Sequence, residues 1–250
     1  MKRLLLLAGL GIILVSVGYP TWRNWRAQKL FDAGLKEFYA QHWSEAAELF
    51  QRTTDYAPDS ADAWHNLGAA RAQMKQYADA IPPLERALCN APGDAENFRL
   101  LGQMQLMVGR HADARKSLES ALRYRPDDGA AYNALGQACH NTGDYSNAVV
   151  GYQAALRYVL RNADLHLNLG VCLAELHRYD AALIQLEEAI RLKPDDAASH
   201  LALGRVYLRL GNWTGAEREL EIVRKLDQKK ADVLQGELDQ MRVIGTDQQT

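Results

Sequence analysis

The chain has 250 residues, of which 48% are hydrophobic, and its formal net charge is -2. This length allows a substantial core in one or two domains. The near-neutral charge and the scattered basic residues exclude the strongly basic surface of a nucleic-acid-binding protein, so we predict no nucleic-acid partner.

The first element in chain order is a predicted membrane segment. Lys2 and Arg3 precede an uncharged apolar run from Leu4 to Val17. Aromatic and basic residues follow the run: Tyr19, Trp22, Trp25, Arg23, Arg26 and Lys29. This order is typical of a transmembrane signal anchor, because aromatic residues favour the headgroup layer. We therefore predict a single-pass anchor over residues 1–26, with residues 4–22 in the lipid bilayer.

A cleaved signal peptide is the alternative interpretation of the same segment. An ideal helix from Leu4 to Val17 rises only about 21 Å, against a hydrocarbon core of about 30 Å. Ser16 and Gly18 are also small enough to form a cleavage site. An anchor therefore has to include the residues up to Trp22 and thin the bilayer locally.

The charges beside the segment predict its orientation. Lys2 and Arg3 on a short N-terminal tail favour a cytoplasmic N-terminus, although Arg23, Arg26 and Lys29 oppose this orientation. We predict the inner (cytoplasmic) membrane of a bacterium, with the rest of the chain on the periplasmic, extracytoplasmic side.

Six copies of a 34-residue pattern occupy the chain after this segment. Glycine recurs at Gly34, Gly68, Gly102, Gly136, Gly170 and Gly204. Alanine follows each glycine at Ala46, Ala80, Ala114, Ala148, Ala182 and Ala216. A large residue follows each alanine at Phe50, Leu84, Leu118, Tyr152, Leu186 and Leu220. Four copies end at Pro58, Pro92, Pro126 and Pro194.

This pattern resembles the tetratricopeptide repeat, which runs from an aromatic residue through Leu-Gly and alanine to proline. The resemblance implies an all-α fold, a right-handed superhelical solenoid of six antiparallel helix pairs over residues 27–244. Its repeats start near residues 27, 61, 95, 129, 163 and 197. Apolar residues at helical spacing, from Ala231 to Met241, predict a capping helix over residues 231–244. Residues 245–250 are expected to be a disordered tail.

Turn residues predict how the helices of each pair begin and end. Acidic or polar pairs precede three of the first helices: Asp59-Ser60, Asp127-Asp128 and Asp195-Asp196. We interpret these pairs as N-terminal caps and not as calcium ligands. Glycines that suit a left-handed helix end follow three of the first helices: Gly109, Gly143 and Gly211. Pro82 and Pro83 fall inside a predicted helix, which they are expected to kink.

No pattern of catalytic residues accompanies the repeats. The sequence contains no Gly-rich phosphate loop, nucleophile elbow or close metal-ligand spacing, so we predict no enzymatic activity and no cofactor. Cys89, Cys139 and Cys172 are widely spaced, and we interpret them as buried apolar residues. His166 and His200 occupy the aromatic position of their repeats and are predicted to pack in the core.

The resemblance also implies where partner proteins bind. In this family the first helix of each repeat lines a concave surface that holds a peptide or a partner helix. The candidate partner-binding residues are Phe31, Leu35, Phe38, His65, Asn66, Arg99, Gln103, Asn133, Gln137, His140, Asn168, Arg205 and Arg209. The family's clamp for chaperone C-termini is incomplete, because Phe31, Leu35 and Glu96 replace required basic or amide residues.

Two functional hypotheses follow from the anchor and the repeats. The first is a membrane-anchored interaction scaffold, or an accessory or assembly subunit, of a membrane or envelope protein complex. The alternative is a periplasmic adaptor that binds peptides or immature proteins transiently, like a chaperone. A stable co-purifying complex favours the scaffold, and weak exchangeable peptide binding favours the adaptor.

Overall fold

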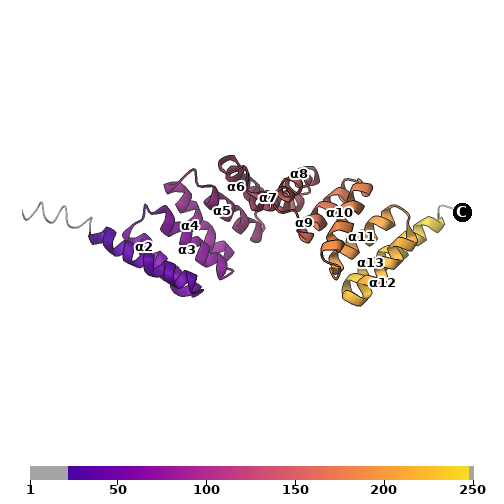
Figure 1. Cartoon of the computed structure of the whole chain (residues 1–250), viewed down its shortest axis with the longest axis horizontal. Helices are drawn as coiled ribbons and strands as arrows, with labels where there is room; N and C mark the ends of the chain where they lie inside the picture. The colour runs from indigo at the N-terminus through magenta and orange to yellow at the C-terminus, as the bar shows by residue number, and fades with distance from the viewer. Residues whose placement is uncertain (1–21, 248–250) are drawn as a thin grey trace, which may run out of the picture. The chain divides into compact units, whose positions relative to one another are not determined.

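The computed structural model of the chain describes the backbone of residues 22–247 and the side chains of residues 22–242 (Figure 1). The predicted membrane segment lies outside these residues except for its last five positions, 22–26. Among the helices so described, none combines the length and the apolar character that a bilayer crossing requires.

Every regular element between residues 22 and 247 is an α-helix, which confirms the predicted all-α class. The first helix covers residues 22–39, so it already includes Trp22, ahead of the predicted repeat start at residue 27. The others are α2 (Trp43–Tyr56), α3 (Ala61–Gln73), α4 (Tyr77–Asn90), α5 (Ala95–Met107), α6 (His111–Tyr124), α7 (Gly129–Asn141), α8 (Tyr145–Leu156), α9 (Ala163–Glu175), α10 (Tyr179–Leu192), α11 (Ala197–Arg209), α12 (Trp213–Leu226) and α13 (Gln228–Asp247).

The helices form two compact units that divide between Pro126 and Asp127. The first unit contains the helix over residues 22–39 and α2 to α6, and the second contains α7 to α13. In each unit the first helix of a pair packs on its own partner and on the second helix of the preceding pair, as α3 does on α4 and α2. This stacking is the helical repeat arrangement that the 34-residue pattern predicts.

The recurring glycine marks the closest approach within each pair. A Cβ built on Gly102 of α5 would lie 2.6 Å from Cγ of Leu118 and 3.2 Å from the carbonyl oxygen of Ala114, both in α6. The equivalent glycines of four other repeats meet their own large residue in the same way: Gly34, Gly68, Gly136 and Gly170. The glycine therefore makes room for the large residue four positions after the alanine, as well as for the helix backbone.

Gly204 in α11 departs from this arrangement. Its Cβ position lies 2.7 Å from Cδ2 of Leu234, which belongs to α13 and not to the second helix of the pair. Leu234 and Leu238 are fully buried in a cluster with Leu220 and Val223 of α12. The last helix, α13, thus packs on both helices of the final pair, and its bounds of Gln228–Asp247 are wider than the predicted 231–244.

Polar side chains cap the N-termini of the first helices, and residues with positive φ angles follow their C-termini. Ser60, Asp94, Asp128, Asn162 and Asp196 each accept a hydrogen bond from a backbone N–H in the first turn of α3, α5, α7, α9 and α11. The second member of each predicted pair is therefore the cap. Gly109, Gly143 and Gly211 have positive φ angles of 78°, 75° and 70°, as predicted. Gln41, Lys75 and His177 adopt the same conformation at the equivalent turns.

The proline pair does not interrupt its helix, because α4 continues from Tyr77 to Asn90 across Pro82 and Pro83. Pro83 has no N–H to donate to the carbonyl oxygen of Asp79, four residues earlier. Nη1 of Arg71, in α3, donates to that oxygen at 2.9 Å instead. An arginine of the neighbouring helix thus replaces one of the two backbone hydrogen bonds that the prolines remove.

The three cysteines do not share one environment. Cys139 and Cys172 are buried as predicted, but the prediction is wrong for Cys89, which is exposed near the end of α4. Burial raises the pKa of the Cys172 thiol to about 12, and the nearby Glu175 and Cys139 add to this effect. The Cys172 thiol therefore stays protonated at neutral pH and packs as an apolar group.

We predict that Gly102→Ala lowers the free energy of unfolding by about 1–3 kcal/mol, because the methyl group overlaps the buried Leu118. Gly236→Ala is the matched control, since no atom lies within 4 Å of its Cβ position in α13. The control should leave stability unchanged or raise it by up to about 1 kcal/mol, because alanine favours helix over glycine. Urea unfolding followed by circular dichroism measures both. Equal stability of the two variants would contradict the close approach.

Candidate partner-binding groove

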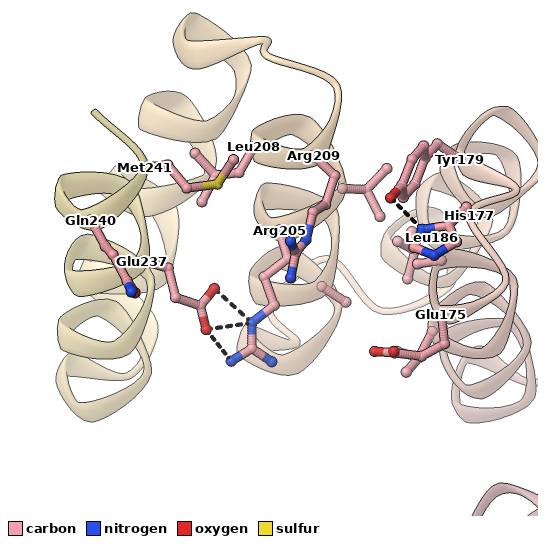
Figure 2. A pocket seen from close by; sticks show the side chains of 14 residues that line it. Glu175, His177, Tyr179, Leu186, Arg205, Leu208, Arg209, Glu237, Gln240 and Met241 are labelled. Atoms are coloured by element: carbon pink, nitrogen blue, oxygen red, sulfur yellow. Dashed lines mark hydrogen bonds and ion pairs between the residues drawn. The ribbon is translucent and has the colours of Figure 1, made fainter. Parts of the chain in front are cut away.

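A groove of about 550 Å³ lies in the second unit, between α9, α11 and α13 (Figure 2). We call it the α9–α11–α13 groove. Its apolar lining residues are Val171, Ala174, Leu186, Ala202, Val206, Leu208 and Met241. Its other lining residues are Glu175, His177, Tyr179, Arg205, Arg209, Glu237 and Gln240. An apolar floor with a few polar groups is the usual composition of a ligand site.

An ion pair connects two of the helices that line the groove, α11 and α13. Arg205 of α11 donates from Nε to both carboxylate oxygens of Glu237 in α13, at 3.0 Å each, and from Nη2 to Oε1 at 2.6 Å (Figure 2). The two side chains are 47% and 36% exposed, so water screens the pair. The pair therefore orients Arg205 toward α13 and adds little stability.

Three other charged or polar side chains of the groove have no such partner. Within residues 22–242, Arg209, Glu175 and Gln240 form no hydrogen bond or ion pair, although all three are exposed and line the groove. On the side of α9, Nδ1 of His177 lies 2.8 Å from the hydroxyl oxygen of Tyr179 (Figure 2). The groove thus offers two free groups that donate hydrogen bonds, Arg209 and Gln240, and one carboxylate, Glu175.

The apolar candidates of the first repeat pack partly in its core. Phe31, Leu35 and Phe38 are half-buried and pack against Phe50 and its neighbours. Ring centroids lie 5.7 Å apart for Phe31 and Phe50, and 4.9 Å apart for Phe38 and Trp43. These three candidates offer a partner only part of their surface. Phe31 also lines a smaller hollow of about 230 Å³ in the first unit.

The polar candidates of the second repeat are bonded within the protein. Nδ1 of His65 in α3 lies 2.7 Å from Oδ1 of Asn97 in α5, and Asn97 is only 1% exposed. Asn66 donates from Nδ2 to the carbonyl oxygen of Asp62 at 2.8 Å. His65 therefore joins two repeats, and neither side chain is fully available to a partner.

The polar candidates of the third repeat, Arg99 and Gln103, form part of a network on α5. Arg99 pairs with Glu96 and donates to Oε1 of Gln103 at 3.2 Å. Glu96 also accepts from Nη1 of Arg125 at 3.2 Å. Burial raises the pKa of Glu96, but Arg99 and Arg125 outweigh this effect and hold the pKa below its usual value. Glu96 therefore stays ionised near neutral pH and keeps Arg99 oriented.

The remaining candidates lie in the second unit. Asn133, Gln137 and His140 lie on α7, and Asn168 lies on α9, whereas Arg205 and Arg209 lie on α11. The His140 ring lies 5.6 Å from that of Tyr145, and Oδ1 of Asn133 is buried without a hydrogen-bond partner among the described residues. Of all thirteen candidates, only Arg205 and Arg209 line the α9–α11–α13 groove.

Sequence reasoning missed the side of the groove that α13 provides. Glu237, Gln240 and Met241 were not candidates, although Met241 belongs to the apolar pattern that predicted the helix. The pattern was interpreted only as a cap, because the resemblance assigns the concave surface to repeat helices. His177 and Tyr179 were also missed, because they lie at the turn between α9 and α10.

The second unit contains a buried hydrogen-bonded pair, His200 with Glu219. Nδ1 of His200 lies 2.6 Å from Oε2 of Glu219, and its Nε2 lies 2.9 Å from the carbonyl oxygen of Pro194. Since a carbonyl can only accept, Nε2 donates to Pro194, while Nδ1 faces the carboxyl group of Glu219. His200 and Glu219 are only 5% and 7% exposed. The predicted core role of His200 is confirmed.

The preceding repeat carries the same contact with an amide in place of the carboxyl group. Nδ1 of His166 lies 2.9 Å from Oε1 of Gln185, at the positions that correspond to His200 and Glu219. His166 is half-buried, and its Nε2 has no hydrogen-bond partner among the described residues. The recurrence of this pair at equivalent positions indicates a role in joining the two helices of a pair.

Family models identify the repeats. One model of the tetratricopeptide repeat matches residues 31–95 and 100–152, and a second model of the same repeat matches residues 172–211. Together the matched segments cover more than half of the chain. No curated protein matches the chain in sequence.

Several hundred chains of solved structures resemble this fold. PilF of Pseudomonas aeruginosa is 17% identical with a TM-score of 0.69, over 86% of this chain and 99% of its own. YrrB, described as a TPR protein with an unusual peptide-binding site, is 20% identical with a TM-score of 0.68, over 76% of this chain and 99% of its own. MamA is 18% identical with a TM-score of 0.64, over 69% and 94%. At these identities the likeness shows the fold alone.

We predict that Glu219→Leu lowers the free energy of unfolding by about 1–3 kcal/mol, because it leaves Nδ1 of the buried His200 without a partner. Glu219→Gln is the matched control. Its amide can donate to Nδ1 of the neutral ring, so its effect should stay within about 1 kcal/mol. Urea unfolding measures both. An equal loss in the two variants would show that the hydrogen bond is not what Glu219 contributes.

Proposed function

Because this chain is built from tetratricopeptide repeats, we propose that it is a membrane-anchored protein-interaction scaffold or assembly subunit. Its partner is a segment of another protein that lies in the α9–α11–α13 groove. The partners are subunits of a membrane or extracytoplasmic complex. This proposal rests on the repeats, on the groove and on the N-terminal sequence.

The observation that carries the proposal is the unpaired polar rim of an apolar groove. Val206, Leu208 and Met241 provide apolar surface that a partner's side chain can cover. Arg209 and Gln240 stand beside this surface without hydrogen-bond partners among the described residues. A peptide satisfies both requirements at once, because it carries apolar side chains and backbone acceptors on one strand or helix.

The charged residues of the groove indicate which chemical groups the partner segment carries. Arg209 donates and never accepts, so it selects a carboxylate or a carbonyl on the partner. Glu175 lies on the opposite side, on α9, and favours an amide or a basic group (Figure 2). An amphipathic segment with an acidic residue beside an apolar one fits this arrangement. YrrB, which is described as having a peptide-binding site, supports peptide recognition on this fold.

The proposed location is the inner membrane of a bacterium, with the repeats on the periplasmic side. Its support is the sequence of the N-terminal segment, in which Lys2 and Arg3 precede the apolar run from Leu4 to Val17. Residues 4–22 form the proposed contact with the lipid bilayer. A scaffold held there lies within reach of other membrane proteins.

A transient adaptor is the second candidate, and the size of the groove favours it. A volume of about 550 Å³ accommodates a few residues of a peptide, as at small-molecule sites. Stable complexes usually bury about 1,200–2,000 Å² in total. An adaptor uses the groove alone, whereas a scaffold needs further surface, so the lifetime of the complex distinguishes them.

We predict that Arg209→Gln weakens peptide binding about tenfold, because the partner loses a charge-assisted hydrogen bond. The probe is a peptide selected from a random phage-displayed library on the wild-type chain and measured by fluorescence anisotropy. Arg218→Gln on α12 is the matched control, because Arg218 is exposed and does not line the groove. Equal affinities of the two variants would show that the peptide binds elsewhere.

We predict that the native chain stays in the membrane pellet after alkaline carbonate extraction, because its N-terminal segment spans the bilayer. A chain without residues 1–21 should be released as a folded helical protein. A C-terminal reporter that is active only in the periplasm tests the orientation. Release of the native chain by carbonate, with a mature N-terminus near Tyr19, would instead indicate a cleaved signal peptide.

A further inference from the structure

Residues 22–29, the first part of the described helix over residues 22–39, carry an unusual combination of side chains. Trp22 and Trp25 are 47% and 54% exposed, whereas the three other tryptophans, Trp43, Trp64 and Trp213, are half-buried. Arg23, Arg26 and Lys29 lie on the same two turns, and no acidic residue occurs between Trp22 and Lys29. Two exposed indole rings, two exposed cations and the half-buried Arg23 therefore share one stretch of helix.

Several contacts fix these side chains against the first repeat. Trp22 packs edge-on against Tyr56 of α2, with ring centroids 6.1 Å apart, and the Arg26 guanidinium lies 5.9 Å from the same ring. Arg23 donates from Nη2 to the carbonyl oxygen of Asp55 at 3.2 Å, near the end of α2. These contacts make the stretch part of the packing of the first helix pair.

Trp25 forms a cation–π contact with Lys29. Nζ of Lys29 lies 4.4 Å from the centroid of the Trp25 ring, at cation–π distance. This contact holds an ammonium group at the edge of an exposed apolar surface. Indole rings favour the headgroup layer of a bilayer, and basic side chains beside them attract anionic lipids.

We propose that Trp22, Trp25, Arg26 and Lys29 form a docking surface for an anionic lipid bilayer. The occupant is a lipid surface and not an acidic protein, because exposed indoles and cations together match the layer of apolar chains and phosphates. Charge complementarity and the apolar run that ends a few residues upstream, at Val17, both favour this assignment. It extends the proposed bilayer contact of residues 4–22 into the first repeat, up to Lys29, and gives that repeat its own contact with the headgroups.

Docking orients the first helix pair. Tyr56 and Asp55, at the end of α2, are tied to Trp22, Arg26 and Arg23, so the same end of both helices faces the lipid. The opposite end, at the turn between residue 39 and Trp43, then points away from the bilayer. The surface adds an orientation that a spanning helix alone does not give.

The test uses the full chain in nanodiscs of phosphatidylcholine, with or without phosphatidylglycerol, that contain a headgroup spin-labelled lipid. Quenching of tryptophan fluorescence measures contact with the headgroups. We expect stronger quenching in the anionic discs, and loss of this excess in Arg26→Gln/Lys29→Gln. Lys75→Gln/Arg86→Gln is the matched control, because it removes two exposed cations of the same unit and should keep the excess. Trp22→Phe/Trp25→Phe should remove the quenched signal itself.

Flotation with vesicles separates this surface from the anchor. A chain that floats with neutral vesicles but shows no charge-dependent quenching keeps its anchor and overturns the docking surface. A chain that floats only with anionic vesicles supports the surface without a span, and Arg26→Gln/Lys29→Gln should then bind about 25-fold more weakly, at about fivefold per cation. Equal quenching losses in the two double variants would overturn the assignment to residues 22–29, as would flotation with neither vesicle.

Discussion

The contact between the glycine of each first helix and a large residue of a later helix determines how closely these helices pack. No Cβ fits at Gly68, Gly102 or Gly170, because a leucine of the second helix already occupies that space. This contact sets the distance within a pair, and the stacked pairs then set the distance between neighbouring first helices. In the last repeat the leucine comes from α13, since Leu234 fills the space over Gly204. The packing of α13 on α11 places Glu237, Gln240 and Met241 beside α11, where they line the groove.

The polar residues of the first helices divide into those bonded within the protein and those left to a partner. In the first unit, His65 and Arg99 bond to Asn97 and Glu96, so they hold repeats and helices in place. In the second unit, Arg209 and Gln240 have no such bonds among the described residues and stand beside apolar surface. Buried or oriented hydrogen bonds stabilise a fold, whereas unsatisfied groups at a groove favour binding. The α9–α11–α13 groove therefore combines unpaired polar groups with an apolar surface.

The 34-residue period was sufficient to predict the helices, their pairs, the caps such as Asp128 and Asp196, and the left-handed glycines. These features depend on local backbone chemistry, which the sequence shows directly. The candidate site was predicted less well, because a position on a concave face does not reveal whether a side chain such as His65 already has a partner. Two further features depend on the neighbouring helices in the same way. They are the hydrogen bond from Arg71 to the carbonyl oxygen of Asp79, which Pro83 leaves without its helical donor, and the exposure of Cys89.

Site-specific photo-cross-linking in native membranes tests most directly whether partners bind in the α9–α11–α13 groove. A photoreactive amino acid replaces Met241 or Arg209 in the groove, or Ile184, which is 63% exposed on α10 and does not line it. We expect a discrete cross-linked partner from position 241, a weaker yield of the same partner from position 209, whose arginine contributes to binding, and none from position 184. Cross-linking from position 184, with none from the groove, would contradict the account.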